Sequence, residues 1–281
     1  MTRSVIIIGG PDSGKTNYIG RLWRALDEQS GVLHAVEQPE DINFVMEVTD
    51  HLFRGDFAPR SEHSDARRDF KVVVADQVDG PQSTVIVPDV SGELWRNAVI
   101  DNEISKDWIA ELRSSDAAIL FIRVGSDQDV RPLDWVTSRN MLQKLGSTDA
   151  QELPTQVMLC ELIHFLEDTL IERKDGDLPR LSVVVSAWDL VDEEKFDLGP
   201  IAYLEREYPL VAGRISDLGN RLDVQVFGLS VVGGDLRDDL EYRDSFLQVG
   251  LDGQGWVAAF NGVTWQKEPD VTLPIAWAVG L

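Results

Sequence analysis

Eight residues near the start of the chain have the types and spacing of a phosphate-binding loop. From Gly9 to Thr16 the sequence reads Gly-Gly-Pro-Asp-Ser-Gly-Lys-Thr and matches the Walker A pattern GxxxxGK(S/T). The glycines let the backbone curl so that successive N–H groups point at one phosphate. We expect Lys15 to bridge the β- and γ-phosphates of a nucleotide and the Thr16 hydroxyl to ligate Mg²⁺. A plain glycine-rich turn is the alternative, but such a turn has no use for a lysine followed by a hydroxyl.

The context of this loop supports phosphate binding. The apolar residues 4–8 precede it as an expected strand, and Ile19, Leu22, Trp23 and Leu26 follow it at helical spacing. The positive end of that helix adds to the field that attracts a phosphate. We therefore assign nucleotide binding to Pro11, Asp12, Ser13, Gly14, Lys15, Thr16 and Asn17.

Apolar runs and helical-period stretches alternate along the chain, which is typical of a parallel sheet covered by helices on both faces. The expected strands are 4–8, 70–75, 84–88, 117–124, 181–186 and 224–229, and further helical spacing occurs in 42–53, 159–170 and 204–218. We predict one P-loop domain over residues 1–281, a three-layer α/β/α sandwich around a mostly parallel six-stranded sheet. Inserted segments are expected at about 31–69, 125–153 and 233–270.

Composition restricts the partners and the compartment. Asp and Glu number 49 against 26 Lys and Arg, so the net charge of −23 repels nucleic-acid phosphate and anionic lipid, and we expect neither as a partner. No window approaches the roughly 18 apolar residues of a membrane span, and the apolar start is too short for a signal peptide. We predict a cytoplasmic protein. The single Cys160 allows no intrachain disulfide and is expected to be buried.

A second acidic motif follows the third expected strand. The segment Asp89-Val90-Ser91-Gly92-Glu93 has the form DxxG, which places Asp89 where an acid holds Mg²⁺ through water and Gly92 where a backbone N–H meets the γ-phosphate. An ordinary turn is the alternative. The position at the end of a strand, downstream of the Walker A loop, favours the nucleotide site.

The fifth expected strand ends in a segment that is similar to the NKxD base-reading element of GTPases, Ser186-Ala187-Trp188-Asp189. We assign Ala187, Trp188 and Asp189 to base binding. A carboxylate at Asp189 suits guanine, because the N1–H and the exocyclic amine of guanine are two adjacent donors. Ser186 replaces the usual Asn or Thr, and Ala187 replaces the Lys that packs along the base. A plain loop acid is the alternative for Asp189.

The sixth expected strand ends where GTPases carry an SA(K/L) loop whose backbone touches the guanine O6, and here we assign Ser230 and Val231 to base binding.

The four motifs in this order resemble the TRAFAC-class GTPases over nearly the full chain. The Asp-x-x-Gly-Glu form, the Ala-Trp-Asp loop and the closing segment 273–277 look like bacterial double-GTPases of conflict systems. The resemblance implies GTP and GDP with Mg²⁺, switch behaviour, protein partners and a role in antiviral defence.

Catalysis is expected to be slow. Glu93 stands where switching GTPases carry a Gln, and its charge repels the γ-phosphate. Residues 54–69 contain no Thr to fold over the nucleotide, so Ser61 is the best substitute as a Mg²⁺ ligand, and a serine with no role is the alternative. Arg60 is the strongest candidate in that loop for an arginine finger. The alternative is that the arginines of the loop are solvated and have no catalytic role. The catalytic candidates are Lys15, Glu93 and Arg60. A non-hydrolysing pseudo-GTPase and an ATP-using P-loop protein remain alternative functions.

Overall fold

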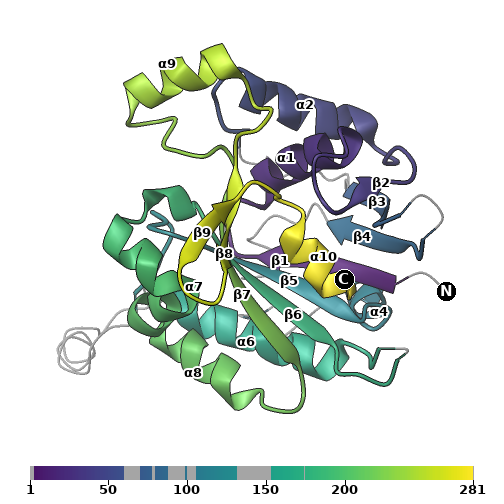
Figure 1. The fold of residues 1–281 in the computed structure, drawn as a ribbon. Coiled ribbons are helices and arrows are strands. Elements are labelled where there is room, and N and C mark those ends of the chain that lie inside the picture. Colours follow the sequence, from purple (N-terminus) through teal and green to yellow (C-terminus); the bar gives the residue numbers. More distant parts are fainter. Residues whose placement is uncertain are drawn as a thin grey trace, which may run out of the picture.

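A nine-stranded sheet forms the centre of the molecule (Figure 1), in the order β2-β3-β4-β1-β5-β6-β7-β8-β9. The computed structural model describes residues 3–59, 70–77, 80–87, 99, 106–131, 153–173 and 175–280. The strands are β1 (Arg3–Gly9), β2 (His34–Ala35), β3 (Phe70–Ala75), β4 (Ser83–Val87), β5 (Ala117–Arg123), β6 (Arg180–Ser186), β7 (Asp223–Ser230), β8 (Trp256–Phe260) and β9 (Trp265–Glu268). The helices are α1 (Lys15–Asp27), α2 (Ile42–Phe53), α4 (Lys106–Leu112), α6 (Thr155–Thr169), the 3₁₀ helix η1 (Trp188–Leu190), α7 (Glu193–Glu207), α8 (Pro209–Asp217), α9 (Leu240–Val249) and α10 (Leu273–Val279).

The middle of the sheet is parallel and its margins are antiparallel. Strands β4, β1, β5, β6 and β7 pair in parallel, whereas β3 with β2 and β4, and β8 with β7 and β9, pair antiparallel. All six predicted strands are present, and the predicted α/β sandwich is confirmed. The count of six was wrong, because β2, β8 and β9 extend the sheet.

The three missed strands carry weak sequence signals. Strand β2 is two residues long, and β9 has the polar sequence Trp-Gln-Lys-Glu, most of it exposed at the edge of the sheet. Strand β8 lies within residues 233–270, where glycines and acidic residues suggested an insertion outside the sheet. Pairing with β7 rather than local alternation makes β8 a strand.

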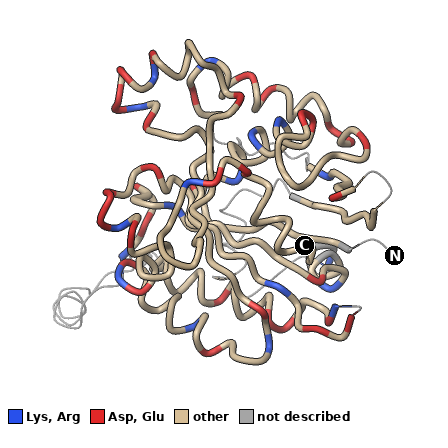
Figure 2. The backbone as a smooth tube through the Cα atoms, in the orientation of Figure 1, with Lys and Arg blue, Asp and Glu red and all other residues tan. Residues whose placement is uncertain are grey.

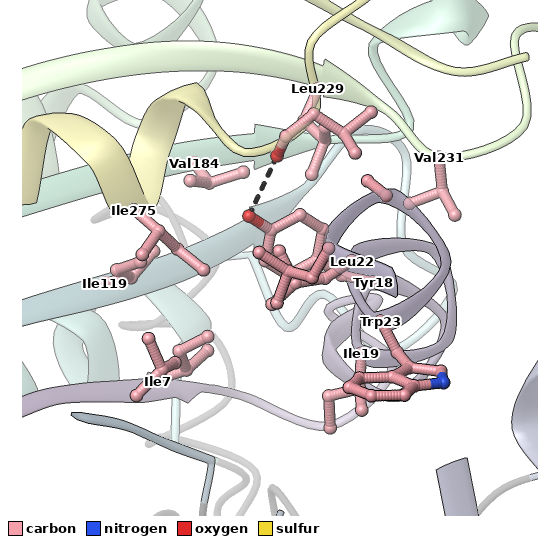
Figure 3. Packing of buried hydrophobic residues seen from close by; sticks show 14 of the residues in the cluster. Ile7, Tyr18, Ile19, Leu22, Trp23, Ile119, Val184, Leu229, Val231 and Ile275 are labelled. Carbon is pink, nitrogen blue, oxygen red and sulfur yellow. Dashed lines mark hydrogen bonds between the residues drawn. The ribbon is translucent and has the colours of Figure 1, made fainter. Parts of the chain in front are cut away.

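Both faces of the central strands are buried. Val5 and Ile7 of β1 pack with α1, α2 and α10, while Ile6 and Ile8 pack with α6, α7 and α8 on the opposite face. Residues from β1, α1, β5 and α10 meet in the first of these cores (Figure 3). Charged residues gather on the helices and loops, and the middle strands are largely free of them (Figure 2). Burial on two faces explains the continuous apolar runs in the sequence.

Two expectations about local structure need correction. The helical period over 204–218 belongs to two helices, because the chain leaves helical geometry at Tyr208 and Pro209 starts α8. Cys160 on α6 is half-buried rather than buried, and this partial burial raises the pKa of its thiol.

Among the described residues, the helices are all too short or too polar to cross a membrane.

Candidate functional site

The loop between β1 and α1 is built around two glycines. Gly14 has a φ of +90°, and Gly9 lies so close to β5 that a Cβ there would stand 2.8 Å from the Phe121 carbonyl oxygen. Side chains rarely adopt the first conformation and cannot fit the second. Helix α1 starts immediately after Gly14 with no side-chain cap. Its first N–H groups therefore face the loop, which makes this end of the helix favourable for an anion.

The Lys15 ammonium group lies across this loop. Its Nζ donates to the carbonyl oxygens of Gly9 and Gly10, at 2.8 and 2.9 Å, and to Ser13 Oγ at 3.0 Å. A lysine ammonium group has three protons to donate and no acceptor. These bonds hold the positive charge at the mouth of the loop, close to the start of α1.

Ser186 ties the phosphate loop to the neighbouring strand. Its Oγ donates to the Ser13 carbonyl oxygen at 2.7 Å, and both residues are buried. Ser186 is the last residue of β6, so the loop after β6 is fixed relative to the loop after β1. Sequence reasoning treated Ser186 only as a departure from Asn. The usable signal was its place in the motif, because a hydroxyl can donate one hydrogen bond as an amide does.

The Asp189 carboxyl and the Ser230 hydroxyl meet between the ends of β6 and β7. Ala187 has a φ of +54°, which turns the chain sharply into η1. Burial raises the pKa of the Asp189 carboxyl, and a hydrogen bond from Ser230 acts in the opposite direction. The Ser230 Oγ also accepts the Gly233 N–H at 2.8 Å. A carboxylate that is oriented by a fully buried hydroxyl presents its remaining acceptor positions in fixed directions.

The side chain of Trp188, a residue that the sequence assigned to base binding, lies in the core. It is fully buried, its ring meets Tyr203 edge-on at 5.3 Å between centroids, and a Cβ on Gly228 would lie 2.6 Å from the indole. The Val231 side chain is also buried in the core. Only the main chain of these two residues remains for a ligand.

Arg123, which sequence reasoning missed, neutralises an acid of the phosphate loop. Its Nη1 lies 3.4 Å from Asp12 Oδ1, and the Ser126 Oγ donates to Asp12 Oδ2 at 3.3 Å. Arg123 ends β5, in register with Ser186 on β6. The pair offsets a negative charge that would otherwise repel phosphate. A basic residue at the end of an apolar strand was the signal available in the sequence.

The start of the expected switch loop is fastened to α1. The Asn17 Oδ1 accepts the Ala58 N–H at 2.9 Å. Pro11 and Thr16 lie in the same loop-helix unit as Lys15. Five assigned residues lie outside the described residues, namely Arg60, Ser61, Asp89, Gly92 and Glu93. The described part of the expected Mg²⁺ site is therefore Thr16, on the first turn of α1.

Comparison with known proteins yields one family and several distant folds. The sequence model of a family described as Double-GTPase 1 matches residues 6–278. The search of curated proteins gives no match. The structure is similar to a signal recognition particle receptor SRb-GTP/SRX complex from Chaetomium thermophilum, at 13% identity and a TM-score of 0.42, over 84% of this chain and 93% of that chain. It is also similar to the bacterial selenocysteine-specific elongation factor EF-Sec, at 14% identity and a TM-score of 0.40, over 89% of this chain and 29% of that chain. The chain thus spans less than a third of the elongation factor.

Proposed function

Because the chain belongs to the Double-GTPase 1 family, we propose that it binds GTP and GDP with Mg²⁺ and hydrolyses GTP slowly, as a switch that acts on protein partners. Family membership implies a guanine nucleotide as the ligand. One observation carries the proposal: the bond from Ser186 to Ser13 joins a loop with the Walker A sequence to a loop that bears a half-buried carboxylate. These two loops suit the two ends of one nucleotide.

The phosphate end is served by main-chain N–H groups, the start of α1 and Lys15. A fixed ammonium group beside uncapped N–H groups stabilises the charge of a di- or triphosphate. The Lys15 bonds to loop carbonyls support this role, because they keep the ammonium group beside the start of α1, where a phosphate could replace one of its present acceptors.

The base end is served by Asp189. An oriented carboxylate accepts from the two adjacent donors of guanine, whereas the matching edge of adenine offers one donor and one acceptor. Adenine would leave part of the half-buried carboxylate without a partner, which costs up to about 1–3 kcal/mol. The contact between Ser230 and Asp189 supports this specificity because it fixes the direction of the carboxylate.

Mg²⁺ would be held by the Thr16 hydroxyl and, through water, by Asp89, with Ser61 as a candidate third ligand. When bound, the ion neutralises charge on the β- and γ-phosphate oxygens. Lys15 stabilises the same charge from the protein side. Slow hydrolysis follows from Glu93, whose carboxylate repels the γ-phosphate, and Arg60 is the candidate that would offset this charge. The roles of Arg60 and Glu93 stay predictions from the sequence.

Switch behaviour is supported by the bond from Asn17 to Ala58, because it joins the start of the loop at residues 54–69 to the helix that receives the phosphates. A loop anchored at this end can be ordered by a triphosphate and released by a diphosphate. The resemblance to conflict-system GTPases extends the proposal to partners within an antiviral defence system.

Thermal unfolding with Mg²⁺ and GTP, GDP or ATP tests nucleotide choice. Ligand at about 100 times its dissociation constant stabilises a protein by roughly 2.7 kcal/mol, which is a few degrees for a chain of this size. We expect GTP and GDP to raise the midpoint and ATP to leave it unchanged. An equal rise with ATP would exclude guanine specificity. Steady phosphate release from GTP separates the GTPase from the non-hydrolysing alternative.

A further inference from the structure

Tyr242 of α9 covers the loop that follows β7. Its hydroxyl donates to the Val232 carbonyl oxygen at 2.9 Å. Its ring lies directly on the next residues, since a Cβ on Gly234 would stand 2.7 Å from the ring and one on Gly233 would stand 2.6 Å from the hydroxyl oxygen. The loop backbone at residues 232–234 is therefore held by one side chain from outside the recognised motifs.

This loop in turn orients the base-reading acid. The Gly233 N–H donates to Ser230 Oγ at 2.8 Å, and the Ser230 hydroxyl in turn acts on the Asp189 carboxyl, where its hydrogen bond lowers the pKa against the effect of burial. A shift of Val232 and Gly233 would turn the Ser230 hydroxyl and with it the Asp189 carboxylate. Burial, and secondly the Asp189 charge, raise the pKa of Tyr242, so its hydroxyl stays a donor.

The segment after α9 is anchored to α1. Arg21 donates to the Gln254 carbonyl oxygen through Nε at 2.8 Å and Nη2 at 2.6 Å, and Arg24 pairs with Asp252 at 2.9 Å. The Gln254 Oε1 lies 3.2 Å from the Tyr242 hydroxyl oxygen. Figure 1 shows α9 near α2, joined to the sheet through the chain that leads into β8. Tyr242 thus stands between the helix of the phosphate end and the loop of the base end.

A second set of contacts joins α9 to the start of the expected switch loop. Arg243, next to Tyr242, pairs with Asp56 at 3.0 Å, and Leu247 packs so closely that a Cβ on Gly55 would lie 3.2 Å from it. The exposed ion pair contributes little energy by itself. Together with the anchoring to α1, it fixes the helix that presents the Tyr242 side chain.

We propose that Tyr242 is a positioning residue for guanine recognition, which holds residues 232–234 in the arrangement where Ser230 orients the Asp189 carboxylate. This inference rests on the proposed guanine-nucleotide site. It assigns to the segment between β7 and β8 a role in base specificity.

The test compares GDP with inosine diphosphate, which lacks the exocyclic amine of guanine. Dissociation constants for both are measured by calorimetry with Mg²⁺ in the wild type, in Tyr242→Phe and in Asp189→Asn. The preference for GDP over inosine diphosphate reports how well the Asp189 carboxylate is placed. We expect Tyr242→Phe to lower that preference about fivefold, as the loss of one neutral hydrogen bond predicts. When Tyr242→Phe is combined with Asp189→Asn, the preference for GDP should equal that of Asp189→Asn alone.

Tyr18→Phe is the matched control. The Tyr18 hydroxyl donates to the Val271 carbonyl oxygen at 3.0 Å in the core (the dashed line in Figure 3), so the same atom and the same kind of bond are removed elsewhere. This variant should lose stability and keep the GDP preference. If Tyr242→Phe weakens both nucleotides equally, or neither, Tyr242 has only a structural role and the inference is overturned.

The wild type separates this inference from the proposed function. A wild type that binds GDP and inosine diphosphate equally would contradict guanine reading by Asp189, and the inference would fall with it. A wild type that prefers GDP, with the same preference in Tyr242→Phe, would overturn the inference alone.

Discussion

The two ends of the proposed nucleotide site, one for the phosphates and one for the base, are constructed in opposite ways. The phosphate end is one continuous segment from Gly9 to Thr16, and most of its polar groups belong to the main chain. The base end is assembled from side chains of η1, β7 and α9, with the Ser230 hydroxyl buried and Asp189 and Tyr242 half-buried. Main-chain groups follow from local backbone geometry, whereas side chains from distant strands need the whole fold to meet.

The effects of mutations should reflect this contrast. At the phosphate end a single charged side chain serves every nucleotide, whatever its base. At the base end several residues share one task, so single changes should alter the choice of base more than the total affinity.

The largest effect is expected from Lys15→Ala. It removes an ammonium group whose charge-assisted bonds to phosphate are worth about 1.5–3 kcal/mol each, so the affinity for GTP and for GDP should fall at least about hundredfold. Titration with a fluorescent guanine nucleotide measures this loss. Lys195→Ala is the control, because Lys195 forms an exposed ion pair with Asp192 on the first turn of α7. Unchanged binding in Lys15→Ala would contradict the assignment of the phosphate loop.

The second effect is a change of base preference in Asp189→Asn. An asparagine offers a donor where guanine needs an acceptor, and xanthine presents an oxygen in place of the exocyclic amine. We expect the GTP affinity to fall on the order of hundredfold and the affinity for xanthosine triphosphate to rise. Competition between the two nucleotides in the wild type and the variant measures the reversal. A uniform loss for both would mean that Asp189 supports the loop without reading the base.

Ser186→Ala should affect the link between the two ends. It leaves the Ser13 carbonyl oxygen without its 2.7 Å partner, which should lower the free energy of unfolding by about 1–2 kcal/mol and weaken GTP binding severalfold. Denaturant unfolding and GTP titration measure these losses. Ser182→Ala on the same strand is the control, because the Ser182 hydroxyl is buried with no hydrogen-bond partner among the described residues. Equal behaviour of the two variants would show that the Ser186 bond contributes nothing.

The smallest effect is a pH dependence confined to the base end. Burial raises the pKa of the Asp189 carboxyl, so this group takes up a proton at a higher pH than an ordinary aspartate does. The protonated carboxyl cannot accept from both guanine donors, so the GDP affinity should decline as the pH falls, and this decline should begin at a higher pH than an ordinary aspartate would give. Calorimetry across pH measures the decline. Binding of GDP to Asp189→Asn, which has no carboxyl to titrate at this position, should lack the part of the decline that Asp189 causes.

Prediction from the sequence succeeded where the structure depends on local chemistry. Helix α2 was predicted at 42–53 and occurs there, with the Asp41 side chain accepting the Phe44 N–H at 3.1 Å. The central strands were predicted because burial on two faces leaves an uninterrupted apolar run. Strands β8 and β9 were missed because their pairing partners, rather than their own residues, decide their structure.

The sequence by itself determined the Walker A pattern, the α/β fold class and the GTPase family, because each of these follows from residue types at short and fixed spacing. Only the tertiary structure decided that Trp188 belongs to the core, that Ser186 joins the two loops, and that Tyr242 lies on the loop after β7. The direction of a side chain at the end of a strand depends on the neighbouring strands and helices, which can lie anywhere in the chain.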